Sequence, residues 1–446
     1  MENESRESQY FDVNTVREQS PAQVQEKREA KGFFICGVVA GLSVALLIVC
    51  GVYLGSQVKK ALGAQEITLE PTEVGEQIAA SEDSAIDVEL VAKLQALERT
   101  IDEYYYLEEV SDDELQDGIY RGIMEALDDP YSEYYTTEEL EDLMSETEGI
   151  YYGIGAYVSL DTELNMPKIS GVIEGSPAEE VQLRADDIIY EVDGESTYGM
   201  SLTDVVALIK GEEGTEVLLT IYREGESDYL DIPVVRRKVE SPTVEWEMLE
   251  DDIAYIQITE FDDVTVDQFA EALAMVKGSG MKGMILELRT NPGGSMTAVV
   301  DIARMMLPKG LIVYTEDKNG KRVEYKCDGK RELEIPLVVL IDGNSASAAE
   351  ILAGAIQDYG IGTLVGTTTF GKGIVQQIVP FKDGSAVKIT VSSYFTPNGR
   401  NIHEVGIEPD VVCEFDGETY YSTEDHYDNQ LEKAKEVLKE IMAEQQ

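Results

Sequence analysis

Hydrophobic and polar positions alternate with different periods along the chain and divide it into segments. Apolar residues recur at helical spacing over 86–148, which predicts a helical module interrupted by a polar turn. Residues 149–236 mix short strands, glycine turns and one or two helices, the pattern of a compact α+β domain. Over 237–415 buried strands alternate with helices, which predicts a sheet with crossover helices, and 416–446 ends in an amphipathic helix. The expected fold class is therefore multidomain, α/β plus α+β.

The N-terminal part contains an uncharged apolar run at 33–55, about the length that crosses a bilayer as a helix. A cleaved signal peptide is the alternative, but the polar head at 1–32 is long and the apolar run exceeds the usual signal length. We expect an uncleaved single-pass anchor in the cell membrane, followed by a flexible acidic stalk at 56–85. A slight excess of basic residues before the run predicts a cytoplasmic tail, with the folded part outside the cytoplasm.

Charge and cysteine content narrow the classes of partner. The 446 residues include 35 basic and 88 acidic side chains, a formal net charge of −53, so a nucleic-acid backbone would be repelled. Residues 101–150 concentrate acid against the single basic Arg121, and we interpret this run as a solvated helical face. Cys327 and Cys413, the two cysteines outside the apolar run, have no metal-ligand spacing, and the sequence leaves open whether they pair. We expect no nucleic acid, no metal and no cofactor.

Ser347 and Lys372 are the candidate reactive groups. A serine hydroxyl needs a base to take its proton, and a lysine can serve only if burial lowers its pKa enough to populate the neutral amine. A buried strand over 336–343 followed by a helix over 346–360 places Ser347 at a strand-to-helix turn, where free N–H groups and the helix dipole favour a developing anion. The alternative is that Ser345 or Ser347 only caps the helix.

Glycine turns provide two further candidate sites. The loop with Gly153 and Gly155 could hold the C-terminal carboxylate of a peptide that pairs with a sheet edge, although an ordinary turn fits as well. The NPGG turn containing Gly293 follows a buried strand, so only backbone faces the space beyond it. A simple turn before the next helix is an equal interpretation of that segment.

The residues of several motifs resemble one family, the carboxyl-terminal processing peptidases of family S41, which are membrane-anchored or secreted serine endopeptidases with a PDZ domain. The resemblance covers the chain from about Val88 to Asp410. Its motifs, in order, are DPYSEYY (129–135), GIGAYV (153–158), SPAEEVQLRADDII (176–189), ELRTNPGG (287–294), NSASAAEILAGAIQDYG (344–360), FGKGIVQQ (370–377) and TPNGRNIHEVGIEPD (396–410). The resemblance implies a helical module, a PDZ-like domain at 149–236 and a crotonase-like βα-spiral protease core at 237–415.

The resemblance also implies roles for individual residues. It makes Ser347 the nucleophile, Lys372 the general base and Gln376 the residue that orients the lysine. The oxyanion of the tetrahedral intermediate would be held by the backbone N–H groups of Gly293 and Ala348. A histidine base at His403 is not implied, because that position of the motif is not catalytic in the family.

In the PDZ-like part the implied peptide-binding residues are Gly153, Ile154, Gly155 and Arg184, the last at a position where relatives have a basic residue sometimes tied to activation. Relatives usually have glycine where Gln182 stands and often where Asp186 stands, so the turn here is expected to be altered. The implied partners are protein or peptide substrates with accessible C-terminal tails, the membrane through one helix, and a second copy of the chain.

Two alternatives to the protease function remain at this stage. A PDZ peptide-binding scaffold with a silent protease fold is disfavoured because Ser347, Lys372 and Gln376 are all present. Acyl-thioester chemistry on a crotonase-like spiral is disfavoured because the chain has no basic patch for a nucleotide.

Overall fold

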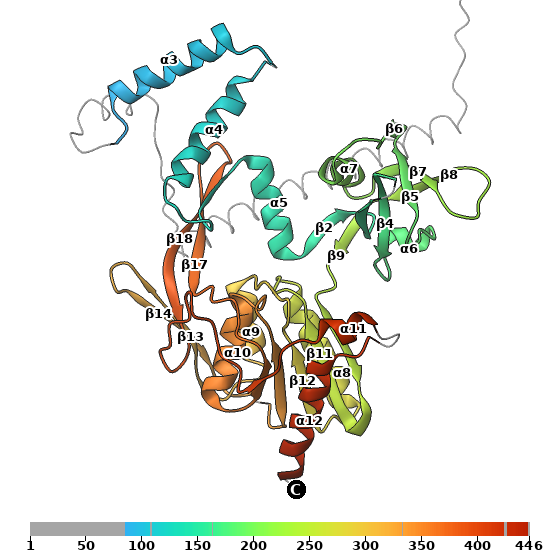
Figure 1. Ribbon diagram of the computed structural model, residues 1–446, viewed down its shortest axis with the longest axis vertical. Coiled ribbons are helices and arrows are strands. Elements are labelled where there is room, and N and C mark those ends of the chain that lie inside the picture. Colours follow the sequence, from blue (N-terminus) through green and yellow to red (C-terminus); the bar gives the residue numbers. More distant parts are fainter. Residues whose placement is uncertain (1–84, 108, 163, 332, 423–425, 445–446) are drawn as a thin grey trace, which may run out of the picture. The chain divides into compact units, whose positions relative to one another are not determined.

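The computed structural model describes residues 85–107, 109–162, 164–331, 333–422 and 426–444 (Figure 1). The expected cytoplasmic tail, the apolar run at 33–55 and nearly all of the stalk lie outside the described residues. Among the helices of the described part, none is both long and apolar enough to span a bilayer.

The segment 86–148 is mainly helical, as predicted. Its elements are α3 (Val88–Tyr104), α4 (Asp112–Glu125), β1 (Glu133–Tyr135) and α5 (Thr137–Glu148). Side-chain caps start the helices: Ser111 with Glu114, and Thr136 with Glu139, form capping boxes before α4 and α5. The polar interruption differs from the expected turn, because it forms strand β1, which pairs antiparallel with a strand of the protease core.

The PDZ-like part folds around its own sheet, whose strands run in the order β3-β4-β5-β7-β8, with β6 paired to β5. Its core contains Ile169, Ile189, Val205 and Leu219. Strands β2 and β9 form a separate two-stranded ribbon. The elements are β2 (Ile150–Gly153), β3 (Ala156–Asp161), β4 (Met166–Val172), α6 (Pro177–Glu180), β5 (Ile188–Val192), β6 (Glu195–Ser196), α7 (Leu202–Ile209), β7 (Glu216–Tyr222), β8 (Leu230–Val235) and β9 (Arg237–Glu240).

The protease core contains the predicted sheet with crossover helices. Its six strands run in the order β10-β11-β12-β15-β16-β19, and every pairing except that of β10 with β11 is parallel. Every residue of β12 and β15 is buried, as expected for parallel strands covered on both faces. The elements are β10 (Val244–Met248), η1 (Glu250–Asp252), β11 (Ile253–Ile258), α8 (Thr265–Gly278), β12 (Gly283–Glu287), α9 (Met296–Ala303), β15 (Leu337–Ile341), α10 (Ala348–Tyr359), β16 (Thr363–Gly366) and β19 (Val411–Val412).

Helices cover both faces of this sheet. Helices α8, α9 and α10 contribute to the larger apolar cluster on one face. On the other face α12 (Asn429–Glu444) buries Ala434, Val437 and Leu438 against Ile285 and Val338. The prediction that the C-terminal helix packs on the body or on a second subunit is thus answered in favour of the body. The short helix α11 (Gly417–Ser422) precedes it.

A second sheet adjoins the core and brings segments that are distant in sequence together. Its strands run in the order β1-β18-β13-β14, and β17 also pairs with β18. The bounds are β13 (Gly310–Asp317), β14 (Arg322–Cys327), β17 (Ile374–Pro380) and β18 (Ala386–Phe395). The register pairs Glu133 of β1 with Lys388 of β18, so the DPYSEYY motif lies beside β18, which also pairs with β17, the strand that follows Lys372.

Candidate active site

The two βα turns singled out in the sequence lie next to each other, at the carboxyl ends of the adjacent parallel strands β12 and β15. Such strand ends are the usual place for a site in an α/β sheet. Hydrogen bonds join the turns: Ala346 N donates to Asn291 O at 2.9 Å, and Thr290 N donates to the Asp342 carboxylate at 2.9 Å. The buried Ser345 hydroxyl donates to Leu288 O at 2.8 Å. Ser345 therefore holds the turns together.

Ser347 has an unusual backbone. Its φ of 52° and ψ of −112° are rare for a residue with a Cβ, and conformations of this kind concentrate at functional sites. It occupies the N-cap position of α10, so the position of the proposed nucleophile and that of the helix cap coincide. The Ser347 N–H donates to the Glu350 carboxylate at 2.9 Å. The Glu350 carboxylate, three residues further on, thus completes the start of α10. It fixes the backbone from which the Ser347 side chain projects.

Gly293 approaches this serine closely. A Cβ placed on Gly293 would lie 2.7 Å from the Ser347 Cβ and 3.0 Å from the Ala348 nitrogen, so only glycine fits there. The two N–H groups assigned to the oxyanion therefore come from adjoining backbone segments. In this structure the Gly293 N–H donates to the side-chain oxygen of Asn291 at 2.8 Å.

Lys372 is half-buried on the loop before β17, and its Nζ lies 4.5 Å from the centre of the Tyr131 ring. Burial lowers the pKa of Lys372, and the positive charge of Lys388 lowers it further, while Asp129 and Glu133 act in the opposite direction. The aromatic face favours the charged ammonium. On balance the pKa of Lys372 is lowered, because desolvation is the largest of these effects.

Glu350 connects the two reactive loops. Its side chain is fully buried, with 0% exposed, and it accepts four hydrogen bonds. The donors are Ser347 N at 2.9 Å, Lys372 N at 2.9 Å, Gly371 N at 2.8 Å and the Thr369 hydroxyl at 2.5 Å. Burial raises the pKa of Glu350, and the four donors oppose this because each stabilises the carboxylate. The carboxylate thus fixes the Ser347 turn against the Lys372 loop.

Tyr394 of β18 makes a second connection. Its hydroxyl lies 3.0 Å from the carbonyl oxygen of Ser347 and 2.6 Å from that of Lys372. The side chain is buried among the residues of the main apolar cluster. The two loops are therefore connected by their N–H groups through Glu350 and by their carbonyl groups through Tyr394.

A cavity of about 370 Å³ brings these groups together, and we call it the Ser347 cavity. Its wall is formed by Leu143, Glu146, Thr147, Glu260, Asp262, Pro292, Gly294, Ser295, Met296, Ser347, Ala348, Ile351, Lys372, Ile374, Val375, Gln376, Ile378, Lys388 and Tyr394. No histidine is among these residues: neither His403 nor His426 lines the cavity.

Gln376 lies in the same cavity, where its amide Nε2 donates to the Thr390 hydroxyl at 3.1 Å. Gln377, the next residue, is exposed and does not line the cavity. Among the described residues no hydrogen bond joins Gln376 to Lys372, or Lys372 to the Ser347 hydroxyl. The structure thus places all three side chains around one cavity without hydrogen bonds between them.

The candidate peptide-binding residues lie in the PDZ-like part. Gly153 ends β2, Ile154 is buried in the domain core, and Gly155 has a φ of 77°. A Cβ on Gly155 would lie 2.3 Å from the Ser176 Cβ, so glycine is required for this close approach. Strand β3, which follows, is at the edge of its sheet, with its neighbour α7 packed against it.

Arg184 is exposed, and its backbone N–H donates to the Asp187 carboxylate at 2.8 Å. Gln182 and Asp186, which stand where relatives usually have glycine, have φ values of 63° and 70°. Both residues take the left-handed backbone conformation that glycine adopts most easily. The turn therefore differs from that expected of the relatives in its side chains and not in its backbone conformation.

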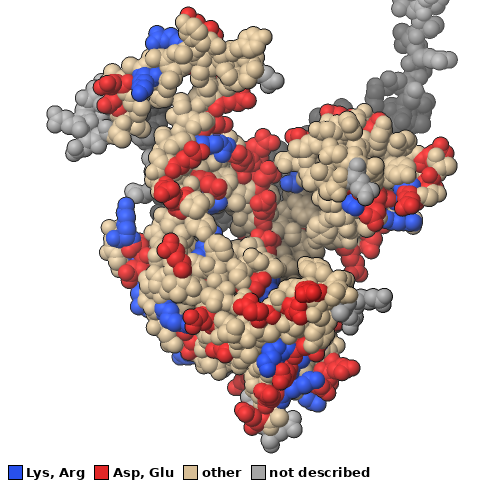
Figure 2. All heavy atoms as spheres, viewed as in Figure 1, with Lys and Arg blue, Asp and Glu red and all other residues tan. Residues whose placement is uncertain are grey.

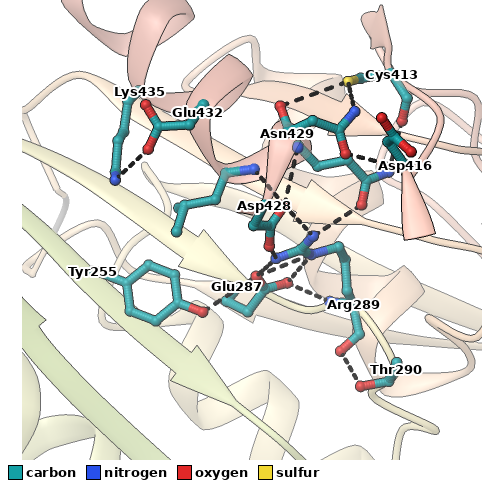
Figure 3. A network of polar contacts seen from close by, with 12 residues as sticks. Tyr255, Glu287, Arg289, Thr290, Cys413, Asp416, Asp428, Asn429, Glu432 and Lys435 are labelled. Carbon is teal, nitrogen blue, oxygen red and sulfur yellow. Dashed lines mark hydrogen bonds and ion pairs between the residues drawn. The ribbon is translucent and has the colours of Figure 1, made fainter. Parts of the chain in front are cut away.

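At the carboxyl end of β12, a second polar network connects this strand to the start of α12 (Figure 3). Arg289 contacts the Glu287 carboxylate with Nε at 2.9 Å and the Asp428 carboxylate at 2.8 Å. Glu287 is almost fully buried, and Tyr255 donates to it at 3.2 Å. Because each charge has a close partner, we interpret this network as the anchor of the C-terminal helix.

The structure also shows the state of the two cysteines and the surroundings of possible metal ligands. Cys327 is buried and Cys413 half-buried, and both are free thiols. Within the described residues no group of three or more histidine, cysteine or acidic side chains could hold a metal ion.

Three residues of the site were missed by the sequence analysis: Glu350, Tyr131 and Asp262. Glu350 had a usable signal, because a serine followed three residues later by glutamate is the spacing of a capping box. Tyr131 belongs to a motif that was noted only as a family mark. Asp262 has no signal in the sequence, since its burial depends on the end of α5 contacting the segment after β11, where Asp263 N donates to Thr147 O.

Three family profiles match segments of this chain. The profile described as Peptidase family S41 matches residues 252–413, a PDZ domain profile matches 168–223, and the profile of the Activating protease CtpB N-terminal domain matches 46–139. The chain is 36% identical over 390 residues to the carboxy-terminal processing protease CtpA of Bacillus subtilis, covering 87% of this chain and 78% of that protein. It is 36% identical over 298 residues to the carboxyl-terminal-processing protease of Synechocystis sp., covering 66% and 69%.

Among solved structures, the photosystem II D1 C-terminal processing protease is 31% identical with a TM-score of 0.43, over 71% of this chain and 86% of that chain. The identity to CtpA over most of both chains is sufficient to assign the family. This chain belongs to the carboxyl-terminal processing proteases of peptidase family S41, and it is a serine-type peptidase with a PDZ domain.

Proposed function

We propose that the protein cleaves peptide bonds by a Ser-Lys mechanism in the Ser347 cavity. The observation that supports this most directly is that Ser347 and Lys372 line one cavity and that a single buried carboxylate, Glu350, accepts N–H groups from both. Each residue has a feature that suits its role: Ser347 a strained helix-start backbone, and Lys372 a lowered pKa.

The proposed reaction proceeds in two steps through an acyl-enzyme. The neutral Lys372 amine leaves the Tyr131 ring, takes the Ser347 proton as the hydroxyl oxygen attacks the substrate carbonyl, and then gives that proton to the departing amine. In the second step the amine takes a proton from water, which attacks the ester and releases Ser347. The N–H groups of Ala348 and Gly293 hold the oxyanion in both steps, and Gly293 must exchange its Asn291 partner for that oxygen.

Gln376 is proposed to orient the lysine during this cycle. Its side chain lines the cavity, and its amide at present donates to Thr390. An amide oxygen turned toward the cavity can accept from the Lys372 amine and direct its lone pair at the serine.

The test is the loss of cleavage in Ser347→Ala and Lys372→Ala, measured with a fluorogenic peptide that has a free C-terminus. Circular dichroism should stay unchanged for both variants. Lys330→Ala is the matched control, because that lysine is exposed and its ion pair in the described part of the chain is with the exposed Asp328. Turnover by Lys372→Ala at the wild-type rate would contradict the role of the base.

The PDZ domain supports substrates with accessible C-termini. We propose that the loop at Gly153, Ile154 and Gly155 holds the terminal carboxylate while the peptide adds to the edge of β3, with the exposed Arg184 as the positive charge that the family resemblance implies. A peptide with an amidated C-terminus should then bind Ser347→Ala protein at least about tenfold more weakly than the free acid, a loss equivalent to ~1.4 kcal/mol. Equal affinities would contradict this assignment.

The membrane and assembly proposals rest on the sequence and on exposed apolar side chains. We propose that 33–55 anchors the protein in the cell membrane with the protease outside the cytoplasm; deletion of this run should move it from the membrane fraction to the soluble fraction.

We also propose a homo-oligomer, because α3 has no buried residue and exposes Leu90, Val91 and Leu97. Light scattering of α3 variants in detergent would test it.

The silent scaffold is the other candidate. It would bind peptides without turnover, so wild type and Ser347→Ala would be indistinguishable in the cleavage assay.

A further inference from the structure

The Ser347 cavity is also lined by acidic residues that have no role in the proposed mechanism. Asp262 follows strand β11 and lines the cavity, yet only 5% of the residue is exposed. The residue before it, Phe261, bonds to the oxyanion turn on both sides: its N–H donates to Gly293 O at 2.8 Å, and its carbonyl accepts from Ser295 N at 2.6 Å. Asp262 is therefore held beside the turn at which the scissile carbonyl would lie.

The carboxylate of Asp262 has no partner among the described residues. Its backbone N–H donates to the Thr265 hydroxyl at 2.8 Å, but no hydrogen bond or ion pair involves the carboxylate oxygens. The comparably buried carboxylates Glu287 and Asp187 each contact an arginine. The residue is 5% exposed, but its carboxylate oxygens are not among the fully buried, unpartnered atoms of the described residues, so they open onto the cavity that the residue lines. A carboxylate that faces a cavity without a protein partner suggests that a ligand completes it.

The surroundings of Asp262 are acidic. Glu146 at the end of α5 and Glu260 line the same wall, and the side chain of Asp262 packs on Gly149, the C-cap of α5. Figure 2 shows acidic side chains gathered along α5. Burial, followed by the charges of Glu260, Asp263 and Glu146, raises the pKa of Asp262 to about 7.

The cavity is thus polarised between two walls. Lys372 and Lys388 act on each other electrostatically, whereas Asp262 is acted on by Glu260 and Glu146, and all five of these residues line the cavity. A basic substrate side chain would be repelled by the ammonium of Lys388 and attracted to Asp262, where an ammonium or guanidinium group supplies the missing donor.

We propose that Asp262 is a specificity-determining residue that binds a lysine or arginine side chain of the substrate close to the scissile bond. The inference rests on the proposed function of the Ser347 cavity. It assigns a substrate class to that site: peptides with a basic residue next to the cleaved bond, in addition to an accessible C-terminus.

The test uses a peptide series in which one lysine is moved through each position flanking the cleaved bond, with norleucine as the uncharged isostere. For the full-length protein we expect one position at which lysine is preferred over norleucine by at least about tenfold in kcat/KM, the value of a charge-assisted hydrogen bond. In Asp262→Asn this ratio should fall to about threefold or less, because the amide keeps the shape and loses the charge. Glu148→Gln is the matched control: it removes a charge from exposed α5 surface that does not line the cavity, and the ratio should remain.

Binding to Ser347→Ala protein, followed by fluorescence anisotropy of the same labelled peptides, separates the two proposals. If wild type cleaves nothing but Ser347→Ala binds the lysine peptide selectively through Asp262, the mechanism fails and the subsite stands. If cleavage depends on Ser347 but every lysine-to-norleucine ratio is near one, or Asp262→Asn leaves the ratio intact, the subsite is wrong and the mechanism stands.

Discussion

The backbone N–H of Gly293 donates a 2.8 Å hydrogen bond to the side-chain oxygen of Asn291, two residues earlier in the same turn. Asn291 is fully buried, and its amide nitrogen donates to Ile258 O at 2.8 Å, so it cannot move freely. In the absence of substrate, the N–H group that would stabilise the oxyanion therefore already has a hydrogen-bond acceptor within its own turn. An incoming oxyanion must compete for that N–H, and its negative charge favours it over a neutral amide oxygen.

The close approach of Gly293 to Ser347 leads to a prediction about substitution. Gly293→Ala should reduce kcat/KM by about 100-fold or more, because the new Cβ would lie 2.7 Å from the Ser347 Cβ and displace the donors from the oxyanion. Gly320→Ala is the control, since Gly320 also has a positive φ, of 76°, but nothing lies within 4 Å of the added atom. If both variants lose activity equally, backbone strain and not the approach to Ser347 is responsible.

The pH dependence of activity should report the amine of Lys372. Because the base must be neutral, kcat/KM should rise with pH through a pKa that burial and Lys388 place below that of an ordinary lysine. Lys388→Gln removes a repelling charge and leaves the Glu133 carboxylate without its ammonium partner, with only the neutral Tyr135 hydroxyl still donating to it among the described residues. Both changes favour the ammonium, so the acid limb of the profile should move to higher pH by about half a unit to one unit.

Rates measured from about pH 6 to pH 10 cover this limb. Lys326→Gln serves as the control on the exposed strand β14. A shift toward lower pH in Lys388→Gln would contradict the assignment of Lys372 as the titrating base.

The role of Glu350 can be tested with its amide. Glu350→Gln replaces one of the two acceptor oxygens with a donor that faces N–H groups of the Ser347 and Lys372 loops. We expect activity to fall by about 100-fold and the free energy of unfolding by about 2–4 kcal/mol, since buried donors lose their acceptor. Thermal unfolding and the peptide assay measure the two effects, with the exposed Glu408→Gln as control. Wild-type values in both assays would show that the carboxylate does not organise the site.

The unpaired Asp262 should affect stability in a pH-dependent way. Its folded pKa of about 7 lies above the unfolded value of roughly 3.9, so the fold binds the proton more tightly and loses stability as pH rises between these values. Replacement by asparagine removes this loss. Relative to wild type, Asp262→Asn should gain about 1–3 kcal/mol between pH 5 and pH 8.

Unfolding temperatures of the two proteins at both pH values provide the measurement. The groups facing the carboxylate, Glu260 and Asp263 from its own segment and Glu146 from α5, stay in place in the variant. A constant difference in unfolding temperature would mean that Asp262 does not titrate in this range.

Local sequence was sufficient for the elements, and it indicated Ser347 and Lys372 as the candidate reactive pair. The period of apolar residues identified the strands β12 and β15 and the helices that follow them, because both strands are buried and bounded by glycine turns. Order alone placed Ser347 and Gly293 at equivalent strand ends, which parallel pairing then made neighbours. The C-terminal helix was predicted by its apolar face, although the sequence did not distinguish packing on the body from packing on another subunit.

The long-range contacts were decided by the tertiary structure. Tyr131 reaches Lys372 only because β1 pairs with β18, and Glu350 accepts from the Lys372 loop only because that loop folds back over α10. Asp262 is buried by α5, which is remote in sequence and would be read from its charge as a solvated helix. Sequence patterns report which face of an element is apolar; they do not report which polar groups the folded chain removes from water, and the chemistry of this site depends on those groups.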